Sequence, residues 1–235
     1  MTYDPPQRTI HRLWIGPTPL PLAYEEYGQR WADLNPGWAV RMWTEQDVED
    51  MGLANQRIWD HIKERGGVSS IAHSYAAARA TQMADVAGYE IVHRHGGVYV
   101  NCDMEPLRPL SDLPADSEDA WACLEIAHWL NNGALGGPAG HPFWKLVIDE
   151  LPRRWDRMPG EAMHLVTGPH LLTEVAYREN SGITILPRHL FNYAGYDDVK
   201  LGEDASRFRR AAYKAGAISL HHWAHRTAAM RTDVR

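Results

Sequence analysis

The sequence predicts an α/β protein. In the first half of the chain, short runs of β-branched and aromatic residues alternate with longer stretches of helical spacing. Glycine and proline breakers separate these runs. The chain has 235 residues, of which 44% are hydrophobic, so it can bury a substantial core.

The first half predicts three strands and three helices. The first strand ends at Gly16-Pro17, and Asn35-Pro36-Gly37 separates the first helix from the second strand. Thr44 is a good N-cap, with Asp47 three residues later. We expect strands at residues 9–15, 38–43 and 98–104, and helices at 20–34, at 45–51, and from Ser69 or Ser70 to about residue 95.

The second half is less regular. It contains no internal repeat and no low-complexity linker, so we expect a single domain over residues 1–235. The predicted elements are strands at 121–126, 183–186 and 217–221, helices at 143–151 and 164–177, and a Gly- and Pro-rich loop at 131–142.

Composition excludes several classes of function. A formal net charge of −6 argues against a nucleic-acid-binding protein, which usually carries a basic excess. Two cysteines without a CxxC pair predict neither a disulfide framework nor structural zinc. We find no signal peptide and no transmembrane segment of ~20 apolar residues, so we expect a cytoplasmic protein. Ten Trp and ten Tyr suit the walls of a binding cleft.

The most informative short pattern is the Asn101-Cys102-Asp103 tripeptide at the end of the predicted strand 98–104. Alternation along a strand would place Tyr99, Asn101 and Asp103 on one face. Amide and carboxylate oxygens suit Mg²⁺ or Mn²⁺, which bind few protein ligands and complete their shells with water and phosphate. A surface turn capped by an Asx side chain is the alternative for such a tripeptide.

The segment at residues 85–110 resembles the DxD-containing region of glycosyltransferase family 32, which includes Golgi-type α-mannosyltransferases and is related to glucosylating bacterial toxins. The family reads approximately S-D-L-L-R-Y-x-x-L-Y-x-x-G-G-I-Y-x-D-x-D-x-x-x-L-x-P-L. The residues in register are Asp85, Tyr89, Gly96, Gly97, Tyr99, Asp103, Leu107, Pro109 and Leu110. Further similar segments in family order are 10–16, 35–38, 43–44, 132–134, 140–143, 167–169, 186–187 and 221–223.

This resemblance implies a GT-A-type fold, a single domain with a mixed, mostly parallel nucleotide-binding sheet flanked by helices. It also implies a hexosyltransferase that uses a nucleotide-sugar, UDP- or GDP-linked, with Mn²⁺ or Mg²⁺ and with retention at the anomeric carbon. Residues 1–110 would form the nucleotide-sugar-binding half and residues 111–235 the acceptor-side half. The acceptor would be a glycan, protein or lipid. By the same resemblance, the catalytic residues are Asp85, Asp103 and His221; the donor-binding residues are Trp14, Asp85, Tyr99, Asn101 and Asn132; the metal ligands are Asp103, Asn101 and His221.

Three positions depart from the family pattern. Asn101 replaces its first Asp, Gly88 replaces its Arg, and Arg226-Thr227 stand where it has Ser-Trp. An Asn removes one negative charge from a cation site, and losing the Arg removes a forked donor for a sugar or phosphate. These changes favour an alternative, a degenerate relative that binds a nucleotide-sugar or glycan without transfer. A nucleotide-sugar hydrolase is a further alternative, whereas no GxGxxG supports an oxidoreductase.

Overall fold

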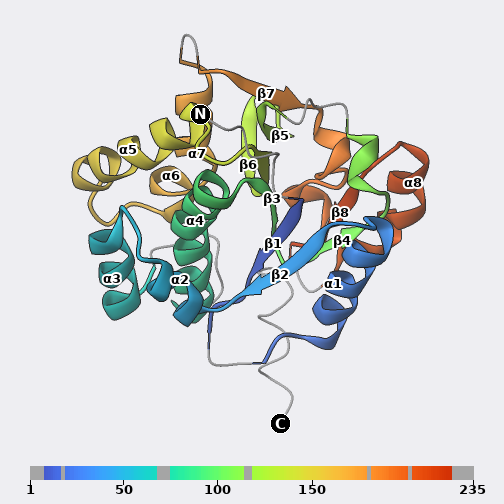
Figure 1. The fold of residues 1–235 in the computed structure, drawn as a ribbon, viewed down its shortest axis with the longest axis horizontal. Helices are drawn as coiled ribbons and strands as arrows, with labels where there is room; N and C mark the ends of the chain where they lie inside the picture. The colour runs from blue at the N-terminus through green and yellow to red at the C-terminus, as the bar shows by residue number, and fades with distance from the viewer. Residues whose placement is uncertain are drawn as a thin grey trace.

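A six-stranded sheet runs through the centre of the protein and separates two layers of helices (Figure 1). The computed structural model describes residues 8–16, 19–67, 75–113, 118–178, 181–200 and 203–223. The strand order is β2-β1-β3-β6-β5-β7, and β6 alone runs antiparallel to its neighbours. The strands are β1 Thr9–Leu13, β2 Ala39–Trp43, β3 Gly97–Val100, β5 Ala120–Ile126, β6 Trp129–Gly137 and β7 Ile183–Leu186. The predicted mixed, mostly parallel α/β fold is therefore confirmed.

Helices α2 to α7 lie on one side of the sheet, and α1 and α8 lie on the other with a second, two-stranded sheet (Figure 1). That small sheet pairs β4, Met104–Pro106, with β8, Ser219–His221. The helices are α1 Leu22–Leu34, α2 Glu45–Met51, α3 Gln56–Arg65, α4 Tyr75–His95, α5 Pro142–Arg157, α6 Met163–Val166, α7 Pro169–Ala176 and α8 Arg209–Lys214. Short 3₁₀ turns are η1 Leu110–Asp112, η2 Arg188–Leu190, η3 Tyr196–Asp198 and η4 Ala205–Phe208.

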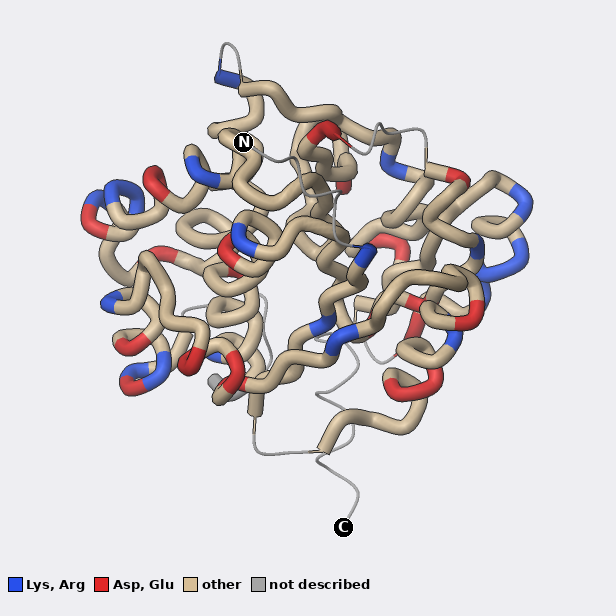
Figure 2. Tube along the Cα trace, in the orientation of Figure 1, with Lys and Arg blue, Asp and Glu red and all other residues tan. Residues whose placement is uncertain are grey.

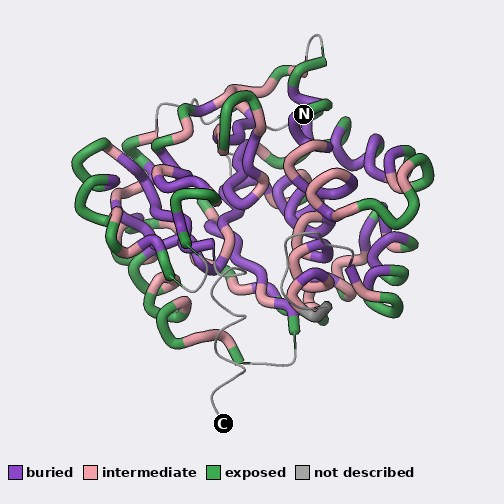
Figure 3. Tube along the Cα trace, turned by 180° about the vertical axis from the view of Figure 1, so that it is seen from behind, coloured by how far each residue is buried: buried purple, intermediate pink, exposed green. Residues whose placement is uncertain are grey.

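The two layers correspond to two apolar clusters on opposite faces of the sheet. One cluster joins α4 and α5 to Tyr99 of β3, and the other joins Trp31 of α1 to Val98 and Val100 of the same strand. This alternation is the one expected for a strand buried on both faces. Figure 3 shows the buried strands at the centre, with exposed positions concentrated on the outer turns and helix faces. In the described residues, no helix has the length and apolar character required to span a membrane.

The strand predicted at residues 98–104 is wrong from residue 101 onwards, where the candidate ligands Asn101 and Asp103 lie. Strand β3 ends at Val100, and the chain then turns, with the Met104 amide donating to the Asn101 carbonyl over 3.1 Å. Asn and Asp favour such turns because their short polar side chains bond nearby backbone. The turn transfers the chain from the large sheet to β4 of the small one. Asn101 and Asp103 therefore do not alternate with Tyr99 along one strand.

The loop predicted at 131–142 is also wrong, because residues 129–137 form β6 in the middle of the sheet. Its glycines accommodate a neighbour rather than a turn. Gly136 lies opposite Trp121 of β5, and a Cβ at Gly136 would be 2.3 Å from the Trp121 ring. The indole covers the place where a side chain would otherwise stand.

The helix predicted at 164–177 is divided in two by Thr167 and Gly168, which precede Pro169 at the first position of α7. The prediction also omitted α3, although Ile58, Trp59 and Ile62 are buried at helical spacing, and it omitted α8. The N-cap of α2 is confirmed as a capping box between Thr44 and Asp47. The cap predicted for α4 at Ser69 or Ser70 lies outside the described residues.

Candidate functional site

The site lies where β1 and β3 end, at the carboxyl edge of the parallel part of the sheet. Trp14 follows β1 and Asn101 follows β3, and these two parallel strands are hydrogen-bonded neighbours. The Cys102 thiol donates to the Leu13 carbonyl over 3.3 Å, which fixes one chain end against the other. Ligands of open α/β sheets bind outside this edge. Trp14 is half-buried, and its ring meets Tyr24 edge-on at 6.1 Å between centroids.

Asp103 and His221 form the first group at this edge. His221 Nε2 lies 3.4 Å from Asp103 Oδ1. Both residues are buried, with an exposed fraction of 3% for His221 and 8% for Asp103. The small sheet positions them, because the His222 amide donates to the Asp103 carbonyl and His221 is the register partner of Met104. A nearly buried carboxylate requires a partner of this kind.

Asn192 orients the His221 ring. The Asn192 amide nitrogen donates to the Leu124 carbonyl over 3.1 Å, so its Oδ1 faces His221 Nδ1 at 3.3 Å. Because Oδ1 only accepts, His221 Nδ1 is the donor in this contact, and Nε2 is left on the side of Asp103. The ring also stacks on Trp223 at 3.9 Å between centroids. This arrangement, with the far nitrogen held by a polar group, is typical of a histidine that binds a cation.

These residues therefore fit a divalent ion. Mg²⁺ and Mn²⁺ commonly use one or two protein side chains and take their remaining oxygen ligands from water and substrate phosphates. The described residues contain no group of three or more His, Cys, Asp or Glu side chains that would enclose a metal by themselves. Asp103 and His221 could thus supply two ligands of such an ion, with water and phosphate oxygens as the others.

Asp85 forms the second group, halfway along α4. Asn132 Nδ2 donates to Asp85 Oδ1 over 2.6 Å, and the Thr167 hydroxyl donates to Oδ2 over 2.8 Å. Burial raises the pKa of Asp85 to about 7, against the opposing effect of these two hydrogen bonds. The break between α6 and α7 is what brings Thr167 to this carboxylate.

Strand β6 joins the two groups. The Asn101 amide donates to the Gly133 carbonyl over 2.8 Å, and Gly133 directly follows Asn132, the partner of Asp85. Asp85 and the 101–103 turn therefore contact two consecutive residues of β6.

Tyr99 does not lie in its predicted place, on one face with Asn101 and Asp103. It is 2% exposed and lies in the core cluster with α4, its ring 3.4 Å from the Cβ position of Gly88.

The raised pKa of Asp85 predicts how stability changes with pH. The native carboxyl keeps its proton up to about pH 7, whereas the ordinary value for the unfolded chain is 3.8. Between these two pH values, the native protein therefore binds more protons at Asp85 than the unfolded chain does. The contribution of Asp85 to the free energy of unfolding consequently falls as the pH rises through that range. As the pH rises from 5 to 8, we expect the free energy of unfolding of Asp85→Asn to increase by about 1–4 kcal/mol relative to that of wild type. Urea unfolding of both proteins at the two pH values measures this difference, and a constant difference would contradict it.

Gly133 predicts a second effect, on packing. A Cβ at this position would be 2.7 Å from Asn101 Nδ2 and 2.8 Å from Asn131 Oδ1. We expect Gly133→Ala to lower the free energy of unfolding by about 1–3 kcal/mol, because overpacking forces neighbours off their rotamers. Urea denaturation checks the size of the loss. A variant as stable as wild type would show that both Asn side chains turn away without cost.

Sequence analysis did not identify several polar residues of this region. Thr167 and Asn192 hold Asp85 and His221, and no short motif marks either of them as a partner. Arg12 is 1% exposed, and its Nη2 donates to the Tyr24 and Cys102 carbonyls. A buried Arg on a strand is a signal that could have been noted, since such a charge needs partners. The predicted departure at Arg226 lies outside the described residues.

Comparisons with known proteins bear on the family and the fold. Residues 21–120 match the family described as glycosyltransferase sugar-binding region containing DXD motif. The chain is similar to inositol phosphoceramide mannosyltransferase 3 of Schizosaccharomyces pombe, at 26% identity over 156 residues, which are 62% of this chain and 37% of that protein. The chain thus spans little more than a third of this curated relative's length.

Two solved structures show the same fold. The PaToxG glycosyltransferase has a TM-score of 0.60 at 15% identity, covering 76% of this chain and 72% of the other. The UDP-bound glycosyltransferase domain of the YGT toxin has a TM-score of 0.51 at 11% identity, covering 76% of this chain and 79% of the other. The predicted resemblance and the predicted fold are confirmed.

Proposed function

We propose, from the match of residues 21–120 to the family described as glycosyltransferase sugar-binding region containing DXD motif, that the protein transfers a hexose from a nucleotide-diphosphate sugar to an acceptor. The cofactor in this proposal is Mn²⁺ or Mg²⁺, and the anomeric configuration is retained. The donor is UDP- or GDP-linked. We place the reaction in the cytoplasm, as the sequence predicted.

The observation that supports the proposal best is the pair of Asp103 and His221, with Asn192 behind the ring. One carboxylate and one oriented imidazole suit a cation that also binds a diphosphate. Such a cation offsets the negative charge that develops on a leaving nucleoside diphosphate. Asn101 lies in the same turn as Asp103 and is the third predicted ligand, through its amide oxygen.

The remaining residues bind and orient the donor in this proposal. Asp85 accepts hydrogen bonds from hydroxyl groups of the sugar, and Asn132 and Thr167 hold its carboxylate in place. A carboxylate held in this way accepts strong, charge-assisted hydrogen bonds. Trp14, at the end of β1, stacks on the nucleotide base. Tyr99 supports this site from the core side of β3.

The comparisons narrow the donor more than the acceptor. One similar structure contains UDP, and the curated relative is named a mannosyltransferase that acts on inositol phosphoceramide. We accordingly propose UDP- or GDP-linked glucose or mannose as the donor. The acceptor is a glycan, a protein or a lipid, bound mainly by residues 111–235, while residues 1–110 contribute most of the donor site.

Nucleotide release from candidate donors tests the proposal. The protein is incubated with UDP-glucose, GDP-mannose and related sugars, with and without Mn²⁺, and free UDP or GDP is measured. We expect release from at least one donor that depends on the ion, because many transferases hydrolyse their donors slowly when water replaces the acceptor. A donor that binds without being cleaved would refute transfer.

That second outcome would support the alternative, a non-catalytic relative that binds a nucleotide-sugar or glycan. Two observations favour it: Asn101 supplies no charge to the cation, and Gly88 carries no guanidinium. Gly88 is also packed against the Tyr99 ring, so its position is filled by an aromatic neighbour. Binding without release, seen as an Mn²⁺-dependent rise in melting temperature, identifies this alternative.

A further inference from the structure

A basic pocket is lined by residues of α1 and of the η4–α8 segment. Its volume is about 410 Å³, and four guanidinium groups line it: Arg30 of α1, Arg207 of η4, and Arg209 and Arg210 of α8. A pocket of this volume accommodates a small molecule. Figure 2 shows the basic residues of η4 and α8 gathered at this edge of the protein.

A buried glutamate fixes two of these arginines. Glu105 is 2% exposed and lies on β4. Arg209 Nε donates to it over 2.7 Å, and Arg30 Nη1 lies 3.2 Å from its Oε1. Burial raises the pKa of Glu105, but hydrogen bonds from His222 and Arg209 outweigh this effect and lower it overall. The carboxylate is therefore charged at neutral pH, and it holds both guanidinium groups at the pocket wall before any ligand binds.

Positive charge remains in excess after these pairs are made. Arg207 pairs with Glu203 at the surface over 3.0 Å, and Asp204 caps the Ser206 amide over 2.8 Å. Arg210 is exposed and forms no hydrogen bond or ion pair with the described residues. Glu105 carries one negative charge, yet both Arg30 and Arg209 pair with it. An anion would satisfy this surplus.

The rest of the lining is apolar. Leu107 and Tyr213 face the pocket, and the guanidinium of Arg108 lies over the Tyr213 ring at 4.4 Å. This cation–π contact holds the ring in place, while the charge of Arg108 is paired with Asp112 over 3.7 Å. The pocket therefore combines forked donors with an apolar wall, which suits a phosphate attached to an organic group better than a free ion.

The pocket adjoins the proposed catalytic site through consecutive histidines. His222 Nε2 lies 3.1 Å from Glu105 Oε2 and 3.2 Å from the Tyr27 hydroxyl. Its neighbour in sequence, His221, faces Asp103. An anion in the pocket is consequently separated from the proposed donor site by one pair of residues on β8 and the loop that follows it.

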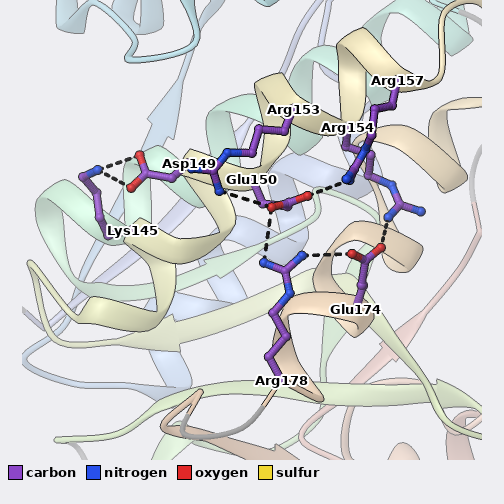
Figure 4. A network of polar contacts seen from close by, with 8 residues as sticks. All are labelled: Lys145, Asp149, Glu150, Arg153, Arg154, Arg157, Glu174 and Arg178. Atoms are coloured by element: carbon purple, nitrogen blue, oxygen red, sulfur yellow. Dashed lines mark hydrogen bonds and ion pairs between the residues drawn. The ribbon is translucent and has the colours of Figure 1, made fainter.

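Another arginine cluster in the protein differs from the pocket, because every arginine in it pairs with a carboxylate. On α5 and α7, Glu150 receives Arg153, Arg157 and Arg178, and Glu174 pairs with Arg154 and Arg178 (Figure 4). These contacts join α5 to the end of α7, and each arginine there meets a carboxylate. They have a structural role, and Arg153 provides a matched control because its side chain is 70% exposed.

We propose that the pocket of Arg30, Arg207, Arg209 and Arg210 binds a phosphate monoester carrying a small organic group. In the proposed reaction this phosphate is the anionic end of the acceptor. Only this role as part of the acceptor rests on the proposed function. Binding of the phosphate itself requires neither the donor nor the cation.

Calorimetric titration with phenyl phosphate at low salt tests the proposal. We expect saturable binding that weakens about tenfold or more in Arg207→Ala/Arg210→Ala, since two charge-assisted contacts are lost. Arg153→Ala and Asp103→Ala should bind as wild type does, the latter because the donor site is not involved. Phenol, which lacks the phosphate, should not bind.

Equal affinity in the double variant, or no saturable binding by wild type, would overturn the proposal. Arg210→Glu is the second variant, because an exposed residue without a partner can be changed with little risk to folding. It should abolish binding while its melting temperature stays near the wild-type value. Phenyl phosphate binding without nucleotide release in any donor screen would remove the proposed transfer and leave this anion site standing.

Discussion

Replacing Asp103 with alanine is expected to lower kcat/KM for donor hydrolysis by about 10³-fold or more. The reason is that the variant loses the carboxylate that faces His221 at 3.4 Å, and with it the charged half of the cation site. Cation stabilisation of a leaving phosphate contributes several kcal/mol, each ~1.4 kcal/mol being a factor of ten in rate. Steady-state measurement of UDP or GDP release at several Mn²⁺ concentrations gives the effect.

The variant should remain folded, because the Asp103 backbone carbonyl still accepts from the His222 amide. Asp103→Asn is a graded test, since it keeps one oxygen ligand without the charge, and it should fall between alanine and wild type. Asp112→Ala, in the 3₁₀ turn η1, serves as the control for removing an exposed carboxylate that pairs with Arg108. Wild-type activity in Asp103→Ala would exclude the assigned role.

Replacing Asp85 with alanine is expected to lower kcat/KM by roughly 10²–10³-fold, because in our proposal the sugar hydroxyls lose their hydrogen-bond partner. The loss should concern the sugar only. Affinity for UDP or GDP alone, measured by calorimetry, should change less than about threefold, since the base and diphosphate contact other residues in our proposal.

Two control variants separate this effect from general damage to α4. Asn132→Ala and Thr167→Ala each remove one of the two donors to the Asp85 carboxylate and should reduce activity less than Asp85→Ala does. A loss of nucleotide affinity equal to the loss of activity would instead assign Asp85 to the fold. Unaltered kcat/KM in Asp85→Ala would exclude it from the donor site.

The sequence indicated most of the sheet because local pattern and tertiary environment agree there. Residues 39–43 and 183–186 are β-rich runs between breakers, and both form strands. Strand β6 could not be predicted in this way, because its glycines are explained by neighbours distant in sequence, such as Trp121 opposite Gly136. Local composition favoured a loop, and tertiary packing overrode it.

The candidate site was predictable in its members and less so in its arrangement. Asp85, Asn132, Asp103 and His221 were identified by resemblance, and the structure places them in two groups joined by β6. The mutual position of the groups depends on a turn at 101–104 and on the break at Thr167, and short-range periodicity specifies neither. Partners such as Asn192 are distant in sequence from the residues they orient, so no local motif marks them.

Binding of Mn²⁺ followed by electron paramagnetic resonance, with and without UDP or GDP, tests the central claim most directly, because the signal of the free ion disappears when the ion is bound. The account predicts weak binding to the protein alone and binding at least about tenfold tighter with one nucleoside diphosphate, since phosphate oxygens complete the ligand set begun by Asp103 and His221. Asp103→Ala should abolish the nucleotide-dependent component. Mn²⁺ binding that neither nucleotide strengthens, or that persists unchanged in Asp103→Ala, would contradict the account.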